Sequence, residues 1–166
     1  MKNQNGVSLP ILIIAIALIL IVAAMIGKYG VRMLKDTKLK DLRTDMLLIQ
    51  ADTKKNLEEV RFQTVNLDKN KEEDLEKIDQ IKKENLKGTL VKGSDIEKNI
   101  PSEITIDDNC YYIEENELKQ MGVKNFETEK YGNYIVKYNF DDITVEVINS
   151  KGYEGQYTLT QLLDDW

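Results

Sequence analysis

Residues 1–28 read MKNQNGVSLPILIIAIALILIVAAMIGK. A short polar leader ends at Gly6, and no charged side chain occurs between Lys2 and Lys28. The apolar block after the leader would be about 30 Å long as a helix, which is enough to span the hydrocarbon core of a membrane. This stretch therefore predicts a transmembrane helix over residues 7–28, followed by a highly charged chain that belongs in water.

Two other interpretations of the apolar block stay open. A helix buried in a soluble core is one, although an uncharged run of about 20 residues is unusual there. A removable secretory signal peptide is the other, but its apolar region is usually only about 7–15 residues long. Ala23 and Ala24 offer a weak cleavage site for it. Pro10 suits the start of a helix, because the N–H that proline lacks would have no partner in the first turn.

The junction Gly6-Val7-Ser8-Leu9-Pro10, directly before the apolar block, resembles the prepilin signature of type IV pilins and type II secretion pseudopilins. The resemblance implies that a prepilin peptidase cuts after Gly6 and N-methylates Val7. Lys2 would supply the positive charge of the leader peptide, residues 1–6. The apolar helix would be kept, first as a membrane anchor and later packed against the helices of other pilin-like subunits.

Ile11 stands where members of this family usually carry Glu, at the fifth position of the mature chain. Within the family, the lack of this acid resembles the tip-type minor pseudopilins, which start a filament. The resemblance thus implies a structural subunit of a bacterial type IV filament or type II secretion apparatus, and no enzyme. It also implies an α+β, pilin-like fold. In that fold a long N-terminal helix, transmembrane and then amphipathic, packs on a small antiparallel sheet.

Six basic residues crowd the C-terminal flank of the apolar block: Lys28, Arg32, Lys35, Lys38, Lys40 and Arg43. The positive-inside rule predicts that the chain after this flank stays in the cytoplasm. The resemblance predicts the opposite: a single-pass protein of the inner, cytoplasmic membrane with an extracytoplasmic C-terminal domain, and later a surface filament. Long domains can cross a membrane despite such charge. At the level of sequence the orientation stays open.

Charge is distributed unevenly along the rest of the chain. Residues 28–98 contain 17 basic and 15 acidic residues, a net charge of +2, whereas residues 99–166 contain 5 and 14, a net charge of −9. The shift predicts a boundary near Ile100-Pro101, between an amphipathic helical region, 29–99, and an acidic α+β region, 100–166. Such acidity is unsuited to nucleic-acid binding, so we expect no specific nucleic-acid partner.

Helical spacing is clear after the basic flank. Apolar residues spaced by three or four positions form one stripe: Leu39, Leu42, Met46 and Ile49. Polar Thr53 and Asn56 follow, and Val60 resumes the stripe, which is typical of an amphipathic helix lying on a sheet. A second helix is predicted over residues 71–87, begun by a capping arrangement of Asn70 with Glu73 and ended by Gly88.

The acidic region is richer in strand formers. Short strands are predicted at residues 104–106, 110–113, 134–139 and 143–148. Because only residues 140–142 separate the last two runs, they predict a hairpin. A helix is expected over 115–121, and the spacing of Thr158 and Gln161 predicts a cap for a last short helix.

Catalytic patterns do not stand out in this sequence. The chain has no histidine and one cysteine, Cys110, which we interpret as a small core residue because nothing in the sequence would activate its thiol. Carboxylate pairs occur at 107–108, 141–142 and 164–165. Such pairs are typical of turns and surfaces, and a calcium role at one of them is an alternative. We predict no catalytic residue, metal ligand or cofactor.

Two further functional interpretations accompany the resemblance. One is a single-pass, membrane-anchored interaction protein that forms no filament. The other is an anchored enzyme that uses carboxylates, which the absence of the usual catalytic combinations disfavours.

Overall fold

A computed structural model describes the backbone of residues 9–164 and the side chains of residues 34–164. The leader and the predicted processing residues Lys2, Gly6 and Val7 lie outside this range, as do the side chains of the predicted transmembrane segment, 7–28. Among the described residues, no helix is both long and apolar enough to cross a membrane. The chain divides into two compact units, Met1–Lys40 and Asp41–Trp166, and the second contains the sheet.

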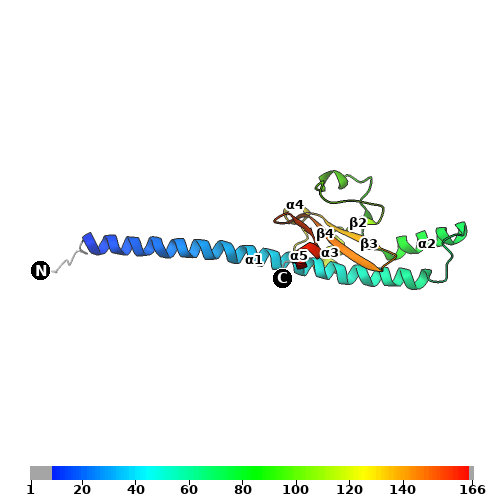
Figure 1. Ribbon diagram of the computed structural model, residues 1–166, viewed down its shortest axis with the longest axis horizontal. Helices are drawn as coiled ribbons and strands as arrows, with labels where there is room; N and C mark the ends of the chain where they lie inside the picture. The colour runs from blue at the N-terminus through cyan, green and yellow to red at the C-terminus, as the bar shows by residue number, and fades with distance from the viewer. Residues whose placement is uncertain (1–8, 165–166) are drawn as a thin grey trace. The chain divides into compact units, whose positions relative to one another are not determined.

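The fold is α+β, as predicted, with helices and strands in mixed order (Figure 1). The helices are α1 (Leu9–Thr64), α2 (Glu72–Asn85), the 3-10 turn η1 (Glu97–Asn99), α3 (Glu115–Gln120), α4 (Thr128–Tyr131) and α5 (Leu159–Asp164). The strands are β1 (Thr89–Leu90), β2 (Cys110–Tyr112), β3 (Tyr134–Asn139), β4 (Thr144–Tyr153) and β5 (Gln156–Thr158). They form one antiparallel sheet in the order β1-β2-β3-β4-β5.

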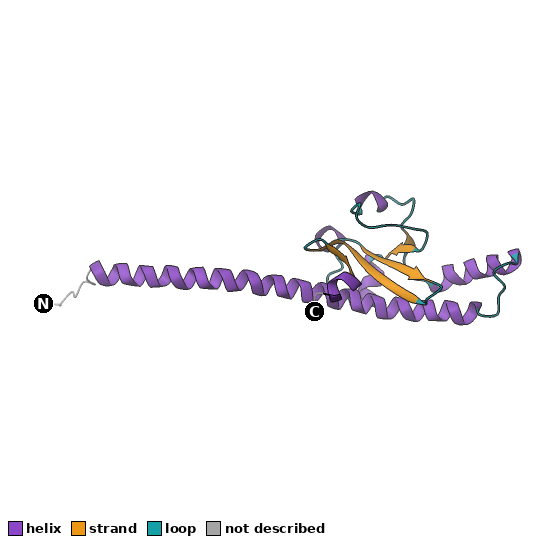
Figure 2. Ribbon diagram, viewed as in Figure 1, coloured by secondary structure: helices purple, strands orange, loops and turns teal. Residues whose placement is uncertain are grey.

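The C-terminal part of α1 packs along one face of this sheet (Figure 2). The predicted stripe is continued by buried residues: Met46, Ile49, Thr53, Leu57 and Val60. Thr53 is tolerated there because its hydroxyl donates a hydrogen bond to the carbonyl oxygen of Ile49, at 2.7 Å. Leu57 belongs to the stripe, whereas Asn56 lies at the border of the stripe, where the Asn56 side-chain amide can bond another segment.

Both faces of the central strand are buried. Tyr134, Val136 and Tyr138 alternate with Ile135 along β3, and all four are buried. On the face opposite α1, Ile135 joins a cluster with Val91, Cys110 and Ile148. A strand with one wet face would instead alternate between buried and exposed residues. The structure thus has a core on each side of the sheet.

The segment 91–106 covers this second core (Figure 1, green). The prediction of a strand at residues 104–106 is wrong: the segment makes a turn, with the N–H of Ile104 donating to the carbonyl of Pro101, and then runs on without strand pairing. Ile104 and Ile106 pack on the sheet instead of extending it. These two residues are apolar because they are buried against the sheet. In the sequence, such a short apolar run looks like a strand.

Cys110 lies fully buried in the same cluster, which confirms its interpretation as a core residue. Burial raises the pKa of its thiol, so the reactive thiolate is disfavoured. The strand prediction at 110–113 is confirmed, apart from its last residue.

The predicted caps have mixed outcomes. The cap of α5 is confirmed: Thr158 Oγ1 accepts from the N–H of Gln161 at 3.2 Å, and Gln161 Oε1 accepts from the N–H of Thr158 at 3.1 Å. The cap predicted from Asn70 and Glu73 is wrong, because α2 begins without a side-chain cap at Lys71. Asp68 instead organises the preceding turn.

The β3–β4 hairpin forms as predicted, with pairing from Tyr134↔Asn149 to Asn139↔Thr144. Asn139 Oδ1 accepts from the N–H groups of Asp141 and Asp142, at 3.0 and 3.2 Å, which shapes the turn. Ile143 has φ of +53° and belongs to this turn, so β4 starts one residue later than predicted.

Replacement of Ile49 by Ala should lower the free energy of unfolding by about 2–5 kcal/mol, because it leaves a cavity between α1 and the sheet. Leu47→Ala is the matched control on the same helix. Leu47 is 44% exposed, so its loss should cost less than about 1 kcal/mol. Urea unfolding followed by circular dichroism measures both changes. Equal losses would contradict the observed packing of the helix.

Candidate functional site

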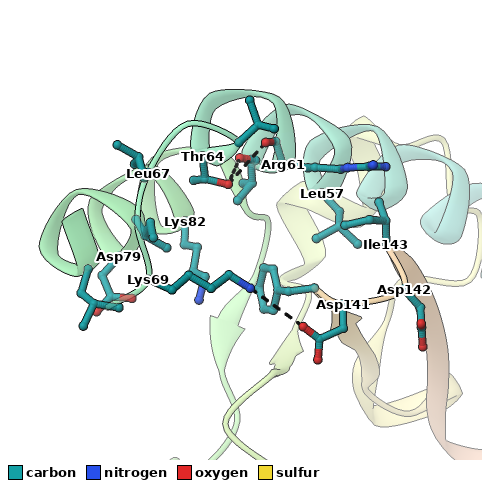
Figure 3. A pocket seen from close by; sticks show the side chains of 15 residues that line it. Leu57, Arg61, Thr64, Leu67, Lys69, Asp79, Lys82, Asp141, Asp142 and Ile143 are labelled. Atoms are coloured by element: carbon teal, nitrogen blue, oxygen red, sulfur yellow. Dashed lines mark hydrogen bonds and ion pairs between the residues drawn. The ribbon is translucent and has the colours of Figure 1, made fainter. Parts of the chain in front are cut away.

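A groove of about 600 Å³ opens between the end of α1, α2 and the turn of the β3–β4 hairpin (Figure 3). Its apolar lining consists of Leu57, Val60, Val65, Leu67, Leu75, Ile78, Phe140 and Ile143. Its polar lining consists of Arg61, Thr64, Lys69, Asp79, Lys82, Asp141 and Asp142. The groove therefore has an apolar floor and a rim with three basic and three acidic residues.

Two contacts connect the helical side of the groove to the hairpin. Lys82 Nζ lies 4.3 Å from the centroid of the Phe140 ring, a cation–π contact. Lys69 Nζ lies 3.9 Å from Asp141 Oδ1, with both side chains largely exposed (Figure 3). An exposed pair at this distance contributes little to stability, so the groove is closed only weakly on this side.

Helix α2 rests on few contacts with the rest of the unit. Ile78 is its one buried residue among those described. At the C-terminal end of α2, Asn56 Nδ2 donates to the carbonyl of Asn85 at 2.8 Å, and Lys87 Nζ pairs with Asp52 Oδ2 at 3.4 Å. The N-terminal part of α2 is thus attached mainly through one apolar side chain.

The segment after α2 is held by Tyr138. Its hydroxyl donates to the carbonyl oxygen of Lys87 at 3.1 Å and accepts from the N–H of Lys87 at 3.3 Å. Burial raises the pKa of Tyr138, so the phenol stays protonated and remains a donor. This pair of hydrogen bonds fixes the end of α2 to the sheet and leaves the groove open beyond it.

The carboxylate pair at 107–108 serves structural contacts. Asp107 Oδ2 lies 2.6 Å from Lys137 Nζ, and this hydrogen-bonded partner lowers the pKa of Asp107. Asp108 pairs with Lys92 at 2.8 Å. Within residues 34–164 no group of three or more His, Cys, Asp or Glu side chains is placed to hold a metal ion.

The groove can therefore bind a partner through shape and apolar contact. Its rim favours neither positive nor negative partners, because its basic and acidic residues are equal in number. This groove was not predicted from the sequence. A signal was present, because Val65 and Leu67 are apolar residues within the otherwise polar connection between α1 and α2. The predicted processing residues lie outside the described residues, so their role stays a prediction.

The structure defines a class by its fold: a long helix packed on a five-stranded antiparallel sheet. Comparison of the chain with models of protein families, with curated proteins and with solved structures found no match.

Ile78→Ala should loosen α2 and widen the groove, because it removes the main apolar attachment of this helix. Hydrogen exchange of the amides in 72–85 should speed up by about tenfold or more, while that of 46–60 stays unchanged. Glu76→Ala, on the exposed side of α2, is the control and should have little effect. Mass spectrometry of peptides after hydrogen exchange measures these rates in the native chain and in both variants. An equal increase in both segments would mean that α2 and the core open together.

Proposed function

We propose that this chain is a pilin-like or pseudopilin-like structural subunit of a bacterial type IV filament or type II secretion apparatus. The proposal is carried by two features that occur together in this chain. A prepilin-type junction, Gly6–Val7, stands directly before an apolar block, and the chain beyond it folds as a long helix packed on a small antiparallel sheet. Neither feature alone would distinguish such a subunit from other anchored proteins.

In this proposal the protein acts by assembly. The prepilin peptidase removes residues 1–6 and methylates Val7, and the apolar helix keeps the subunit in the cytoplasmic membrane. The helix later exchanges lipid contacts for contacts with the helices of other subunits. Ile11, in place of the usual acid, supports a minor or tip position. The folded unit of residues 41–166 then lies outside the cytoplasm and presents its surface to partners.

The runner-up is a single-pass, membrane-anchored interaction protein that does not form filaments. The basic flank at 28–43 favours it, because the positive-inside rule would keep the folded unit in the cytoplasm. The apolar groove suits either proposal, since both need a surface for protein partners.

Mass spectrometry of the full chain, expressed in a host with a prepilin peptidase and extracted from its membrane, tests the cleavage. We expect an N-terminus at Val7 that carries a methyl group. Gly6→Leu should leave the leader in place, whereas Asn5→Ala, one position away, should be cut normally. An intact Met1, or a start beyond Ala24, would contradict the pilin-like proposal.

Protease treatment of intact cells, with the outer membrane made permeable where there is one, tests the orientation. The proposal predicts degradation of the unit at 41–166, with a cytoplasmic marker protein left intact. Full protection of this unit in intact cells, together with its degradation in lysed cells, would favour the cytoplasmic runner-up.

A further inference from the structure

A second groove, of about 470 Å³, has a different character from the first. It lies between η1, the start of α3 and α4. Its lining consists of Ile96, Asn99, Tyr112, Ile113, Glu114, Glu115, Thr128, Glu129 and Asn133. Three carboxylates thus surround apolar and aromatic side chains, and neither Lys nor Arg is among the lining residues. We call this site the acidic groove.

No ion pair among the described residues neutralises the carboxylates of the acidic groove. Glu114 accepts a backbone N–H in the capping box of α3, and Glu115 Oε1 receives the N–H of Thr128 at 3.5 Å. None of the three, Glu129 included, forms an ion pair with another described residue.

A nearby lysine is engaged elsewhere. Lys151 Nζ donates to the backbone carbonyls of Glu129 and Lys130, at 2.7 and 2.8 Å, and so caps the end of α4. The lining of the groove thus combines the carboxylates of Glu114, Glu115 and Glu129 with an apolar floor, and it contains no basic residue. Such a site favours a partner that carries several cations and some apolar side chains.

The chain itself contains a segment of this kind. Residues 28–43 read KYGVRMLKDTKLKDLR, with six basic and two acidic side chains among apolar ones. Along its described part, Lys35 and Lys38 are exposed, and Leu34 is 65% exposed although it is a large apolar residue. The proposed function gives this flank no role, and its charge opposes the orientation that the function requires.

We propose that the basic flank, residues 28–43, of one copy of the chain docks on the acidic groove of a neighbouring copy. The lysines contact Glu115 and Glu129 at the rim, and apolar residues such as Leu34 cover Ile96 and Tyr112. Each copy carries both surfaces, so the contact is head-to-tail and repeats from copy to copy. The inference rests on the proposed function only in that copies stand side by side in one membrane.

Charge supports this pairing over a contact with lipid headgroups. The flank has a net charge of +4, and the region that contains the acidic groove has a net charge of −9. A flank that served only to bind anionic lipid would leave the acidic groove without a partner. Binding of the flank to lipid alone is therefore the competing outcome of the test.

The first experiment measures binding of a fluorescent synthetic peptide, residues 28–43, to the full chain in a zwitterionic detergent. We expect saturable binding that weakens by about tenfold in the double variant E115K/E129K and by a similar factor between about 0.05 and about 0.5 M salt. The double variant E58K/E76K makes the same change of net charge at exposed positions away from the groove, and it should bind within about twofold of the native chain.

Three results would overturn the proposal. One is the absence of saturable binding to the protein, whether or not the peptide binds vesicles of anionic lipid. The second is equal weakening in E58K/E76K, which would mean that only net charge matters. The third is unchanged binding in E115K/E129K. A circular dichroism spectrum and melting curve of each variant show whether it is folded before its binding is interpreted.

The second experiment uses two cysteine variants of the full chain mixed in one membrane. Lys38→Cys in one copy and Glu115→Cys in the other should form an intermolecular disulfide under mild oxidation, whereas Lys38→Cys mixed with Glu76→Cys should not. The native Cys110 is buried and reports the background. Equal cross-linking in both mixtures would contradict the contact. Neither result depends on cleavage after Gly6, so a failure here is distinct from a failure of the proposed function.

Discussion

The seam between α1 and the sheet is the constraint on which the rest of the folded unit depends. Four polar side chains along the seam bond three other parts of the unit. Asp45 accepts hydrogen bonds from the N–H groups of Lys124 and Asn125. Gln50 donates to the carbonyl of Val145 in β4. At the C-terminal end of α2, Asp52 pairs with Lys87 and Asn56 donates to the carbonyl of Asn85. Asp45 is buried, and its charge is tolerable there because Asn125 Nδ2 adds a third donor at 2.6 Å. A helix bonded in this way sets the places of α2, β4 and the loop between α3 and α4, and the apolar stripe between these bonds excludes water.

The two grooves form beside the segments that cover this seam and the opposite face of the sheet, because neither segment covers its surface completely. Helix α2 covers the end of α1 with one buried side chain, and segment 91–106 covers the second core without regular strands. Short covers leave gaps at their borders, and the two grooves are lined by residues of these covers. The first groove has balanced charge, whereas the acidic groove does not. The chain thus offers two surfaces of different chemistry, which suits a subunit that meets more than one kind of neighbour.

An assembly role would bring together features that otherwise conflict. If the apolar block spans a membrane, the basic flank beside it is unfavourable for export, and like charges gathered in the acidic groove repel one another. Both features become favourable if they meet between copies. Electrostatic contacts at the rim of an interface contribute more to rate and specificity than to affinity, so apolar contacts of the membrane helices would supply most of the stability of such an assembly.

Local chemistry made much of the fold predictable from sequence. The spacing of Met46, Ile49 and Val60 determined the buried face of α1, and the β-branched and aromatic run at 134–139 determined β3, because both patterns depend only on neighbouring residues. The cap of α5 is equally local. The sequence by itself also determined the apolar block that follows Gly6 and Val7 and the contrast between the basic flank and the acidic region. Tertiary structure alone decided that residues 104–106 form a cover, that both faces of β3 are buried, and that Glu115 and Glu129 meet at one groove. Those outcomes depend on contacts between segments far apart in the chain, and no periodicity within a single segment records them.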